Sequence, residues 1–141
     1  MALEYHYDLV VVGGGPAGSS TAYEASKNGI KVALLEKEDT IAESVRTSGV
    51  TWIQNIKEFG IPENCYNPIK NYSFCSPNNE VTIKDTIPHA AVLDVRKTYR
   101  FLAEQAKNEG VDIFLKTNIK DVIKNETGDI VGISGTNKEG E

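Results

Sequence analysis

The stretch that decides the fold is Tyr7-Asp8-Leu9-Val10-Val11-Val12-Gly13-Gly14-Gly15-Pro16-Ala17-Gly18-Ser19-Ser20, near the start of the chain. An apolar run typical of a buried strand leads directly into G-x-G-x-x-G and then into a helix. Gly13 permits the tight turn, Gly15 lets backbone N–H groups approach a pyrophosphate, and Gly18 lets the helix pack closely on the strand. The N-terminus of the helix that follows then faces the anion with unpaired N–H groups, and Pro16 and Ala17 of the turn are expected at the cofactor. The stretch therefore predicts a dinucleotide-binding turn.

A second apolar stretch completes a βαβ unit. Residues 21–28 favour a helix, Gly29 a helix stop, and residues 31–35 a second buried strand. Glu36 ends that strand about twenty residues beyond the glycines, where a carboxylate can accept a hydrogen bond from a ribose 2′-OH and would repel a 2′-phosphate. We therefore expect FAD or NAD rather than NADP, with Glu36 and its neighbour Lys37 at the cofactor. The alternatives are a solvated carboxylate at a strand end and an ordinary strand–turn–helix.

Composition limits the other classes of function. The chain has 141 residues, a net charge of −5, 40% hydrophobic and 25% charged residues, which describes one globular domain and disfavours nucleic-acid binding. Because no apolar run approaches the ~20 residues of a spanning helix and the start resembles no signal peptide, we expect a cytoplasmic protein without a transmembrane segment. Cys65 and Cys75 match no zinc or redox spacing, so we expect reduced, partly buried thiols and no metal.

The rest of the chain predicts an interrupted α/β pattern. Residues 50–59 have near-helical spacing, with Trp52 expected in the core or, alternatively, in the wall of a substrate pocket. Strand signals around the turn residues 76–79 predict a β-hairpin within residues 66–91. The α/β character then resumes with a helix over 95–108, a strand over 111–115 and antiparallel strands over 119–123 and 130–133.

Taken in order, these features resemble the FAD domain of the p-hydroxybenzoate hydroxylase and geranylgeranyl reductase superfamily. The resemblance spans nearly the whole chain and includes the segments Val95-Arg96-Lys97-Thr98-Tyr99, Leu102-Ala103-Glu104-Gln105-Ala106 and Gly110-Val111. It implies an α/β fold with a Rossmann-like FAD/NAD(P)-binding βαβ core, an inserted β-hairpin and a β-meander, with residues 66–91 on the substrate-domain side. It also implies FAD as cofactor, with Arg96 at the flavin nucleotide and Arg46 in a loop along the FAD.

A physical argument agrees for Arg96, because a guanidinium offers a planar fork of donors that suits a phosphate or a flavin carbonyl. The alternative for either arginine is a solvent-exposed side chain, for Arg96 beside Asp94.

Within the superfamily, the stretch Arg46-Thr47-Ser48-Gly49-Val50-Thr51 is most similar to the archaeal-type geranylgeranyl reductases. Those flavoenzymes saturate prenyl double bonds of lipids, which implies an FAD-dependent oxidoreductase that delivers hydride from reduced flavin. They commonly place a Cys-Gly pair in this loop, whereas Thr47 and Ser48 precede Gly49 here, and a threonine cannot act as a thiolate. No catalytic acid or base is assigned. The substrate is a small molecule or a lipid, a lipid would imply peripheral contact with the membrane, and the electron donor, NAD(P)H or ferredoxin, is left open.

Superfamily members are longer and carry a second glycine-aspartate motif, which we do not find before Glu141. We therefore expect residues 1–141 to be the N-terminal part of an FAD-binding domain, incomplete at the C-terminus and inactive alone. Three alternatives stay open: a flavin monooxygenase of the p-hydroxybenzoate hydroxylase type, a non-catalytic dinucleotide-binding remnant, and an NAD-linked dehydrogenase. The inserted hairpin and the Arg96 helix disfavour the dehydrogenase, since its domain would continue with further βα units.

Overall fold

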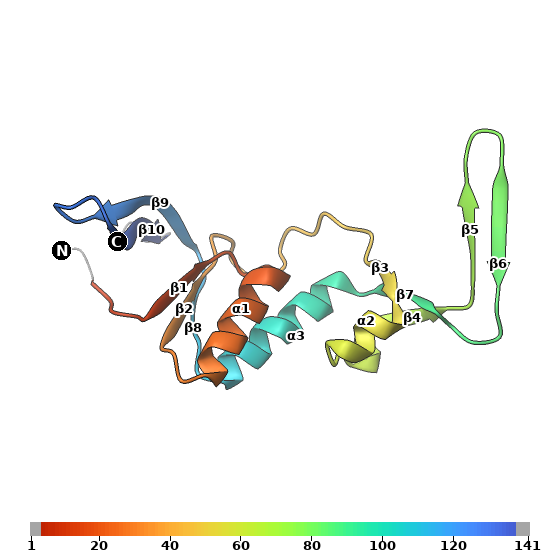
Figure 1. Cartoon of the computed structure of the whole chain (residues 1–141), viewed down its shortest axis with the longest axis horizontal. Helices are drawn as coiled ribbons and strands as arrows, with labels where there is room; N and C mark the ends of the chain where they lie inside the picture. Colours follow the sequence, from red (N-terminus) through yellow and green to blue (C-terminus); the bar gives the residue numbers. More distant parts are fainter. Residues whose placement is uncertain (1–3, 138–141) are drawn as a thin grey trace. The chain divides into compact units, whose positions relative to one another are not determined.

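The computed structural model describes residues 4–137, which divide into two compact units (Figure 1). The first unit comprises the described residues 4–44 and 99–137, and the second unit comprises residues 45–98. The dinucleotide turn belongs to the first unit, and the loop with Arg46 belongs to the second.

A three-stranded parallel sheet forms the centre of the first unit. Its strand order is β1 (Leu9–Val12), β2 (Val32–Leu35), β8 (Asp112–Phe114). Helix α1 (Pro16–Lys27) connects β1 to β2, so the predicted βαβ unit is confirmed. The helix begins earlier than predicted, at Pro16, because the fixed φ of proline and its missing N–H suit the first helical position.

The core of the first unit lies where α1 and the end of α3 (Val95–Asn108) meet the sheet. Its buried members are Ala22, Val32, Leu34, Ala106 and Val111. The inward side chains of β1, Leu9 and Val11, pack against this cluster, whereas Val10 and Val12 are exposed. Burying each large apolar side chain contributes roughly 1.5–3 kcal/mol, so this cluster stabilises the sheet from which the turn leaves.

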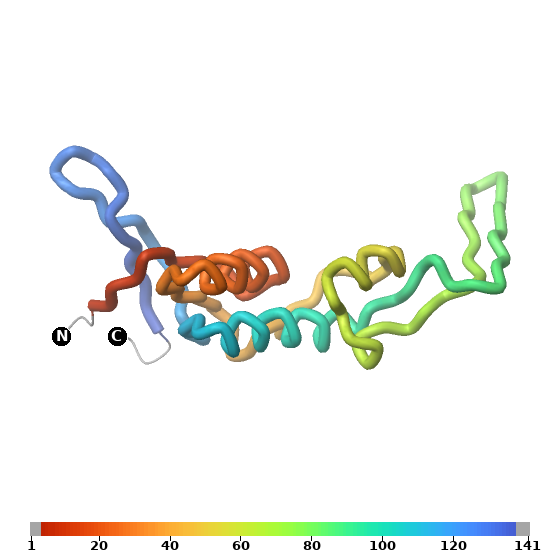
Figure 2. The backbone as a smooth tube through the Cα atoms, turned by 60° about the horizontal axis from the view of Figure 1, so that its bottom comes forward, coloured from red at the N-terminus to blue at the C-terminus, as the bar shows by residue number. Residues whose placement is uncertain are grey.

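In the first unit, a β-hairpin follows the last strand of the sheet. Strands β9 (Thr117–Lys124) and β10 (Ile130–Asn137) pair antiparallel, with register shifts at two points. Figure 2 traces the two strands and the turn that joins them at the blue end of the chain. The turn is held by Asn125, whose Oδ1 accepts the N–H groups of Thr127 and Asp129, and by Gly128 at φ +89°. The predicted antiparallel pair is confirmed, with longer strands.

The second unit contains two antiparallel sheets and two short helices. One sheet has the order β3 (Val50–Trp52), β7 (Ala90–Leu93), β4 (Tyr66–Ile69), and the other is the hairpin of β5 (Asn71–Cys75) and β6 (Glu80–Lys84). Helix α2 (Ile53–Glu58) and the 3₁₀ helix η1 (Glu63–Cys65) lie between β3 and β4 in the chain. The hairpin predicted around residues 76–79 is confirmed.

Two predictions for this unit are wrong. Residues 50–59 are not one helical segment, because residues 50–52 pair with β7 before the helix starts at Ile53. Trp52 is not in the core: it is 52% exposed and makes an edge contact with Tyr72, with ring centroids 6.3 Å apart. The two thiols also differ from expectation, since Cys65 is buried but Cys75 is exposed; both are free.

Candidate dinucleotide site

The turn between β1 and α1 presents an uncapped helix start. Gly13 adopts φ +105°, a conformation that L side chains rarely tolerate, and its N–H donates to the Leu35 carbonyl at 2.7 Å. Gly15 is the N-cap of α1, so no side chain caps the helix, and the first turn contains no acidic residue. The positive end of the helix dipole and its first N–H groups are therefore not neutralised by a capping side chain, which is the arrangement that binds phosphate.

The glycines of the turn play different physical roles. A Cβ on Gly18 would press into the Gly13 carbonyl oxygen and lie 3.4 Å from Val11 Cγ1, so this glycine allows the helix to pack on the strand. A Cβ on Gly15 would meet no protein atom within 4 Å. The space beside Gly15 is thus open for a ligand, whereas the space beside Gly18 is filled by the protein itself.

Glu36 is held by the backbone of two neighbouring segments. Its Oε2 accepts the Gly14 N–H at 2.7 Å, and its Oε1 accepts the Glu38 N–H at 2.9 Å. The side chain is half-buried, so the alternative of a freely solvated carboxylate does not describe it. A carboxylate has about four acceptor positions, of which these bonds use two, and the others remain for donors such as ribose hydroxyls.

Gly14 is a site residue that the sequence analysis missed. It is buried, and a Cβ there would collide with the Ile41 side chain and lie 3.2 Å from Glu36 Oε2. A larger residue at this position would therefore require the Ile41 and Glu36 side chains to move. The signal was the middle glycine of the Gly13-Gly14-Gly15 run, which the G-x-G-x-x-G pattern treats as variable.

The carboxyl ends of β2 and β8 are joined around Glu36. Its own N–H donates to the Phe114 carbonyl at 2.8 Å, and its carbonyl accepts the Thr117 N–H at 2.9 Å. Lys116, at φ +57°, donates its N–H to the Glu38 carbonyl at 2.9 Å. The glycine turn, the end of β2 and the end of β8 thus meet at one edge of a parallel sheet, where α/β proteins bind ligands.

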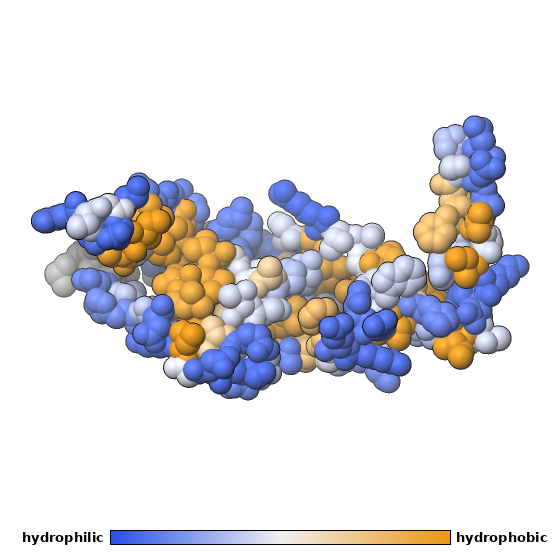
Figure 3. Space-filling view, in the orientation of Figure 1, coloured by the Kyte–Doolittle hydropathy of each residue, from blue (hydrophilic) through white to orange (hydrophobic). Residues whose placement is uncertain are grey.

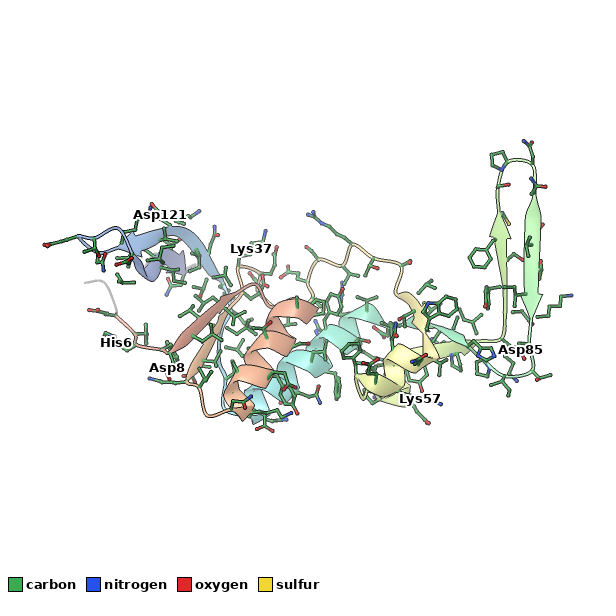
Figure 4. All side chains as sticks on the ribbon, in the orientation of Figure 1. His6, Asp8, Lys37, Lys57, Asp85 and Asp121 are labelled. Carbon is green, nitrogen blue, oxygen red and sulfur yellow. The ribbon has the colours of Figure 1, made fainter. Side chains whose placement is uncertain are left out.

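Lys37 lies at the surface beside this edge (Figure 4). Its Nζ is 3.8 Å from Glu38 Oε1, and its side chain is 68% exposed. An exposed pair of this kind contributes little to stability, so the Lys37 ammonium can reorient toward a bound anion at small cost.

The two predicted arginines belong to the second unit, and both are exposed. Their segments are joined at Gly49, whose carbonyl accepts the Leu93 N–H at 2.9 Å. Gly49 adopts φ +76°, and a Cβ there would lie 2.8 Å from the Leu93 oxygen and 2.7 Å from Val95 Cγ2. The loop that carries Arg46 is therefore packed against the residues that lead into Arg96.

Asp94 caps the helix that carries Arg96, a role the sequence analysis did not assign. Its Oδ1 accepts the Lys97 N–H at 3.1 Å, and its carbonyl accepts the Thr98 N–H at 2.9 Å. The Lys97 N–H is the main cause that lowers the pKa of Asp94, with smaller contributions from the Lys97 and Arg96 charges. An aspartate directly before the helical pattern was the available signal.

His89 is oriented by a carboxylate at the base of the β5–β6 hairpin. Its Nε2 is 3.0 Å from Asp85 Oδ2, and its side chain is 61% exposed. The N–H groups of Ile87 and Thr86 are the main causes that lower the pKa of Asp85, whose position Figure 4 shows.

Within residues 4–137, no group of three or more potential metal ligands gathers, and no helix there is long and apolar enough to span a membrane.

Comparison with known proteins identifies the class. Residues 8–64 match the family DAO, described as FAD dependent oxidoreductase. The chain is 37% identical to the digeranylgeranylglycerophospholipid reductase of Methanococcus vannielii, over 98% of this chain and 36% of that protein. It is 34% identical to an uncharacterized protein in the nifH2 5′ region of Methanosarcina barkeri, over 96% of this chain and 78% of that one. A solved geranylgeranyl bacteriochlorophyll reductase-like protein from Thermoplasma acidophilum superposes with a TM-score of 0.82 and 28% identity, covering 94% of this chain and 35% of that chain.

The fold and the turn thus define an FAD-binding oxidoreductase domain of the Rossmann type. More narrowly, the chain belongs to the superfamily of FAD-dependent oxidoreductases that includes the geranylgeranyl reductases. The predicted fold class, family and FAD cofactor are confirmed. The chain spans about a third of the length of the reductases that it matches. PqsL of Pseudomonas aeruginosa, described as a probable FAD-dependent monooxygenase, shares the fold at 15% identity and a TM-score of 0.71.

Proposed function

We propose that this chain supplies the FAD-binding part of an enzyme that reduces C=C bonds of prenyl lipids. The observation that carries the proposal is the uncapped start of α1 next to Glu36, whose carboxylate is oriented by the turn itself. The names of the relatives, digeranylgeranylglycerophospholipid reductases, support the substrate class. FAD, when bound, would supply the hydride.

The residues of the first unit fit the adenosine diphosphate half of FAD. The first turn of α1, with Gly15, Pro16 and Ala17, would bind the pyrophosphate, and Gly13 and Gly18 would keep this turn tight. Glu36 would accept hydrogen bonds from the adenosine ribose with its remaining acceptor positions. Lys37 would add a cation at the exposed edge.

The resemblance to the superfamily further assigns Arg46 and Arg96 to the FAD. A guanidinium can donate two parallel hydrogen bonds to a phosphate or to a flavin carbonyl and stays charged at any physiological pH. A lipid substrate would bring a cytoplasmic enzyme into peripheral contact with the membrane. The electrons that reduce the FAD would come from NAD(P)H or ferredoxin.

The binding part of the proposal is tested by titrating the chain with FAD and with NAD, following flavin fluorescence and thermal stability. Glu36→Gln should weaken FAD binding at least ~10-fold, because an amide –NH₂ would face one of the two N–H donors that the carboxylate accepts. The matched control is Glu24→Gln, the same change at an exposed carboxylate in the second half of α1 that the proposal does not assign to the cofactor. Tighter binding of NAD than of FAD, or equal effects of the two variants, would contradict the assignment.

The reaction is tested in a chimera in which this chain replaces the matched residues of the M. vannielii reductase. Mass spectrometry of a digeranylgeranyl lipid should show a gain of two hydrogens for each reduced double bond. The control is the same chimera with Arg96→Ala, which should bind FAD less tightly. A chimera that holds FAD and leaves the lipid unchanged under reducing conditions would count against the proposed reaction.

A further inference from the structure

The loop that follows Glu36 carries one large apolar side chain, and that side chain is buried. Residues 37–44 are otherwise polar or small. Figure 3 shows hydrophilic residues at the surface beyond the end of β2, where this loop begins. Ile41, in the middle of the loop, is only 9% exposed. Because the rest of the loop can stay in water, the burial of Ile41 marks a specific packing contact between the loop and the protein.

Ile41 packs on the contact between the glycine turn and Glu36. Its Cδ1 would collide with a Cβ on Gly14, and the same Cβ position lies 3.2 Å from Glu36 Oε2 and 3.3 Å from Glu36 Cβ. The Gly14 N–H donates to Glu36 Oε2 at 2.7 Å. A hydrogen bond is stronger where neighbouring side chains keep water away from it. The Ile41 side chain therefore covers the bond that orients Glu36.

Arg100, on α3, holds the main chain of Ile41. Its Nε–H donates to the Ile41 carbonyl at 3.2 Å, across 59 positions of sequence. The next residue, Ala42, adopts φ +60°, a conformation that non-glycine residues seldom keep unless their surroundings impose it. The bond from Arg100 thus ties the loop to α3 at the residue whose side chain covers Glu36.

We propose that Arg100 is a positioning residue of the cofactor site. It keeps the Ile41 side chain over the bond between Gly14 and Glu36, and through Glu36 it strengthens binding of the adenosine ribose. This role rests on the proposed function in one respect, the assignment of Glu36 to the ribose 2′-OH. An arginine suits the task because its guanidinium stays charged at physiological pH and because a charged donor makes a stronger hydrogen bond than a neutral one.

The first measurement compares ADP with 2′-deoxy-ADP by calorimetry, in the unmodified chain and in Arg100→Met. The unmodified chain should bind ADP about 10-fold more tightly, because only ADP offers the 2′-OH to Glu36. Arg100→Met should bind ADP about 5-fold more weakly and 2′-deoxy-ADP less than ~2-fold more weakly, so the preference for ADP should fall to about 2–4-fold. Equal losses for the two ligands would show that Arg100 supports only the fold or the phosphates, and would overturn the proposal.

The second measurement needs no ligand and follows amide hydrogen exchange. In Arg100→Met the Gly14 amide should exchange at least ~5-fold faster, because water then reaches its bond to Glu36. The Gly13 amide, which donates to the Leu35 carbonyl, is the internal control and should change less than ~2-fold. If the Gly14 amide exchanges as slowly as in the unmodified chain, or if both amides accelerate alike, the proposal is overturned even where Glu36 binds the ribose.

Three further variants serve as controls. Lys107→Met makes a comparable change at an exposed cation in the last turn of α3 and should leave both readouts unchanged. Arg100→Lys keeps a charged donor and should restore part of the preference for ADP. Ile41→Ala removes the covering side chain, and adding Arg100→Met to it should cause no further loss of preference, since both changes act on one contact. Additive losses would overturn the proposal.

The outcomes separate this role from the proposed function. A preference for ADP that is lost in Glu36→Gln but kept in Arg100→Met would overturn the role of Arg100 alone. No preference in the unmodified chain, or a preference that Glu36→Gln leaves intact, would overturn the assignment of Glu36 and the role of Arg100 together. None of these readouts requires lipid reduction, so a failure of the proposed reaction would not change them.

Discussion

Gly15 and Gly18, three residues apart in one turn, should respond to the same substitution in opposite ways. Gly15→Ala adds a methyl group in open space, since no protein atom lies within 4 Å of that Cβ. The residue has φ −73°, which alanine adopts without strain. The Gly15→Ala variant should lose roughly 0.5–1 kcal/mol in its free energy of unfolding, which is the cost of alanine at an N-cap. The pyrophosphate, however, would meet the new methyl group.

Gly18→Ala adds the same methyl group at a position that other protein atoms already occupy. The Cβ would overlap the Gly13 carbonyl oxygen and lie 3.2 Å from the Gly13 carbonyl carbon. Gly13 cannot easily give way, because its N–H donates to the Leu35 carbonyl at 2.7 Å and its φ is +105°. Overpacking costs about 1–3 kcal/mol, against which the better helix propensity of alanine returns up to ~1 kcal/mol. We expect a net loss of about 1–2 kcal/mol.

The assay measures melting temperature without ligand and FAD affinity by fluorescence titration, for both variants and the unmodified chain. Gly18→Ala should melt about 5–10 °C lower without ligand. Gly15→Ala should melt within a few degrees of the unmodified chain and bind FAD about 100-fold more weakly, which corresponds to ~2.7 kcal/mol. Unchanged FAD affinity in Gly15→Ala would refute the pyrophosphate assignment. A Gly18→Ala protein that is as stable as the unmodified chain would refute the packing argument.

Three further predictions concern single side chains. Arg96→Ala should weaken FAD binding and leave the apo melting temperature nearly unchanged; an equal loss of apo stability would instead assign the arginine a structural role. Tyr7 donates its hydroxyl to Asp112 at 2.8 Å, and burial, followed by this bond, raises the pKa of Tyr7 to about 12. Because the folded-state pKa lies above the usual value of about 10, the contribution of Tyr7 to stability is complete below pH 10 and is lost as the pH rises toward 12. Urea unfolding at several pH values should show that Tyr7→Phe flattens this dependence. Parallel pH profiles of the variant and the unmodified chain would contradict the prediction. Asp94→Ala should lower the melting temperature at neutral pH, and this difference should shrink as the pH falls below the usual aspartate pKa, because the Lys97 N–H keeps the folded-state pKa low; a difference that does not depend on pH would show that the charge of Asp94 has no part in capping.

Much of the fold was predictable because the signals are local. The apolar run before Gly13 and the helix that follows it are contiguous, so strand, turn and helix can be read from neighbours in the sequence. Helix α3 was predicted with its observed bounds, because its apolar face repeats with helical spacing and Gly110 ends it at φ +94°. The hairpins were predictable from turn residues between alternating strands.

The wrong predictions depend on partners that lie far away in the chain. Trp52 fits a helical spacing with Ile56, but pairing of residues 50–52 with β7, some forty residues later, makes it part of a strand and leaves its ring exposed. Cys75 is exposed because it lies near the tip of a hairpin that its own unit does not cover, which its local sequence does not reveal.

The sequence by itself determined the class of this protein: a βαβ unit with a phosphate-binding turn and an acidic strand end, because glycine conformation, helix dipole and apolar periodicity act over a few residues. Only the tertiary structure decided how the site is built. Gly14 donates to Glu36 across 22 positions of sequence, and Glu36 is held to β8 through Phe114 and to the start of β9 through Thr117. These bonds depend on the register in which β1, β2 and β8 pair. That register is determined by the packing of α1 and α3 on the sheet.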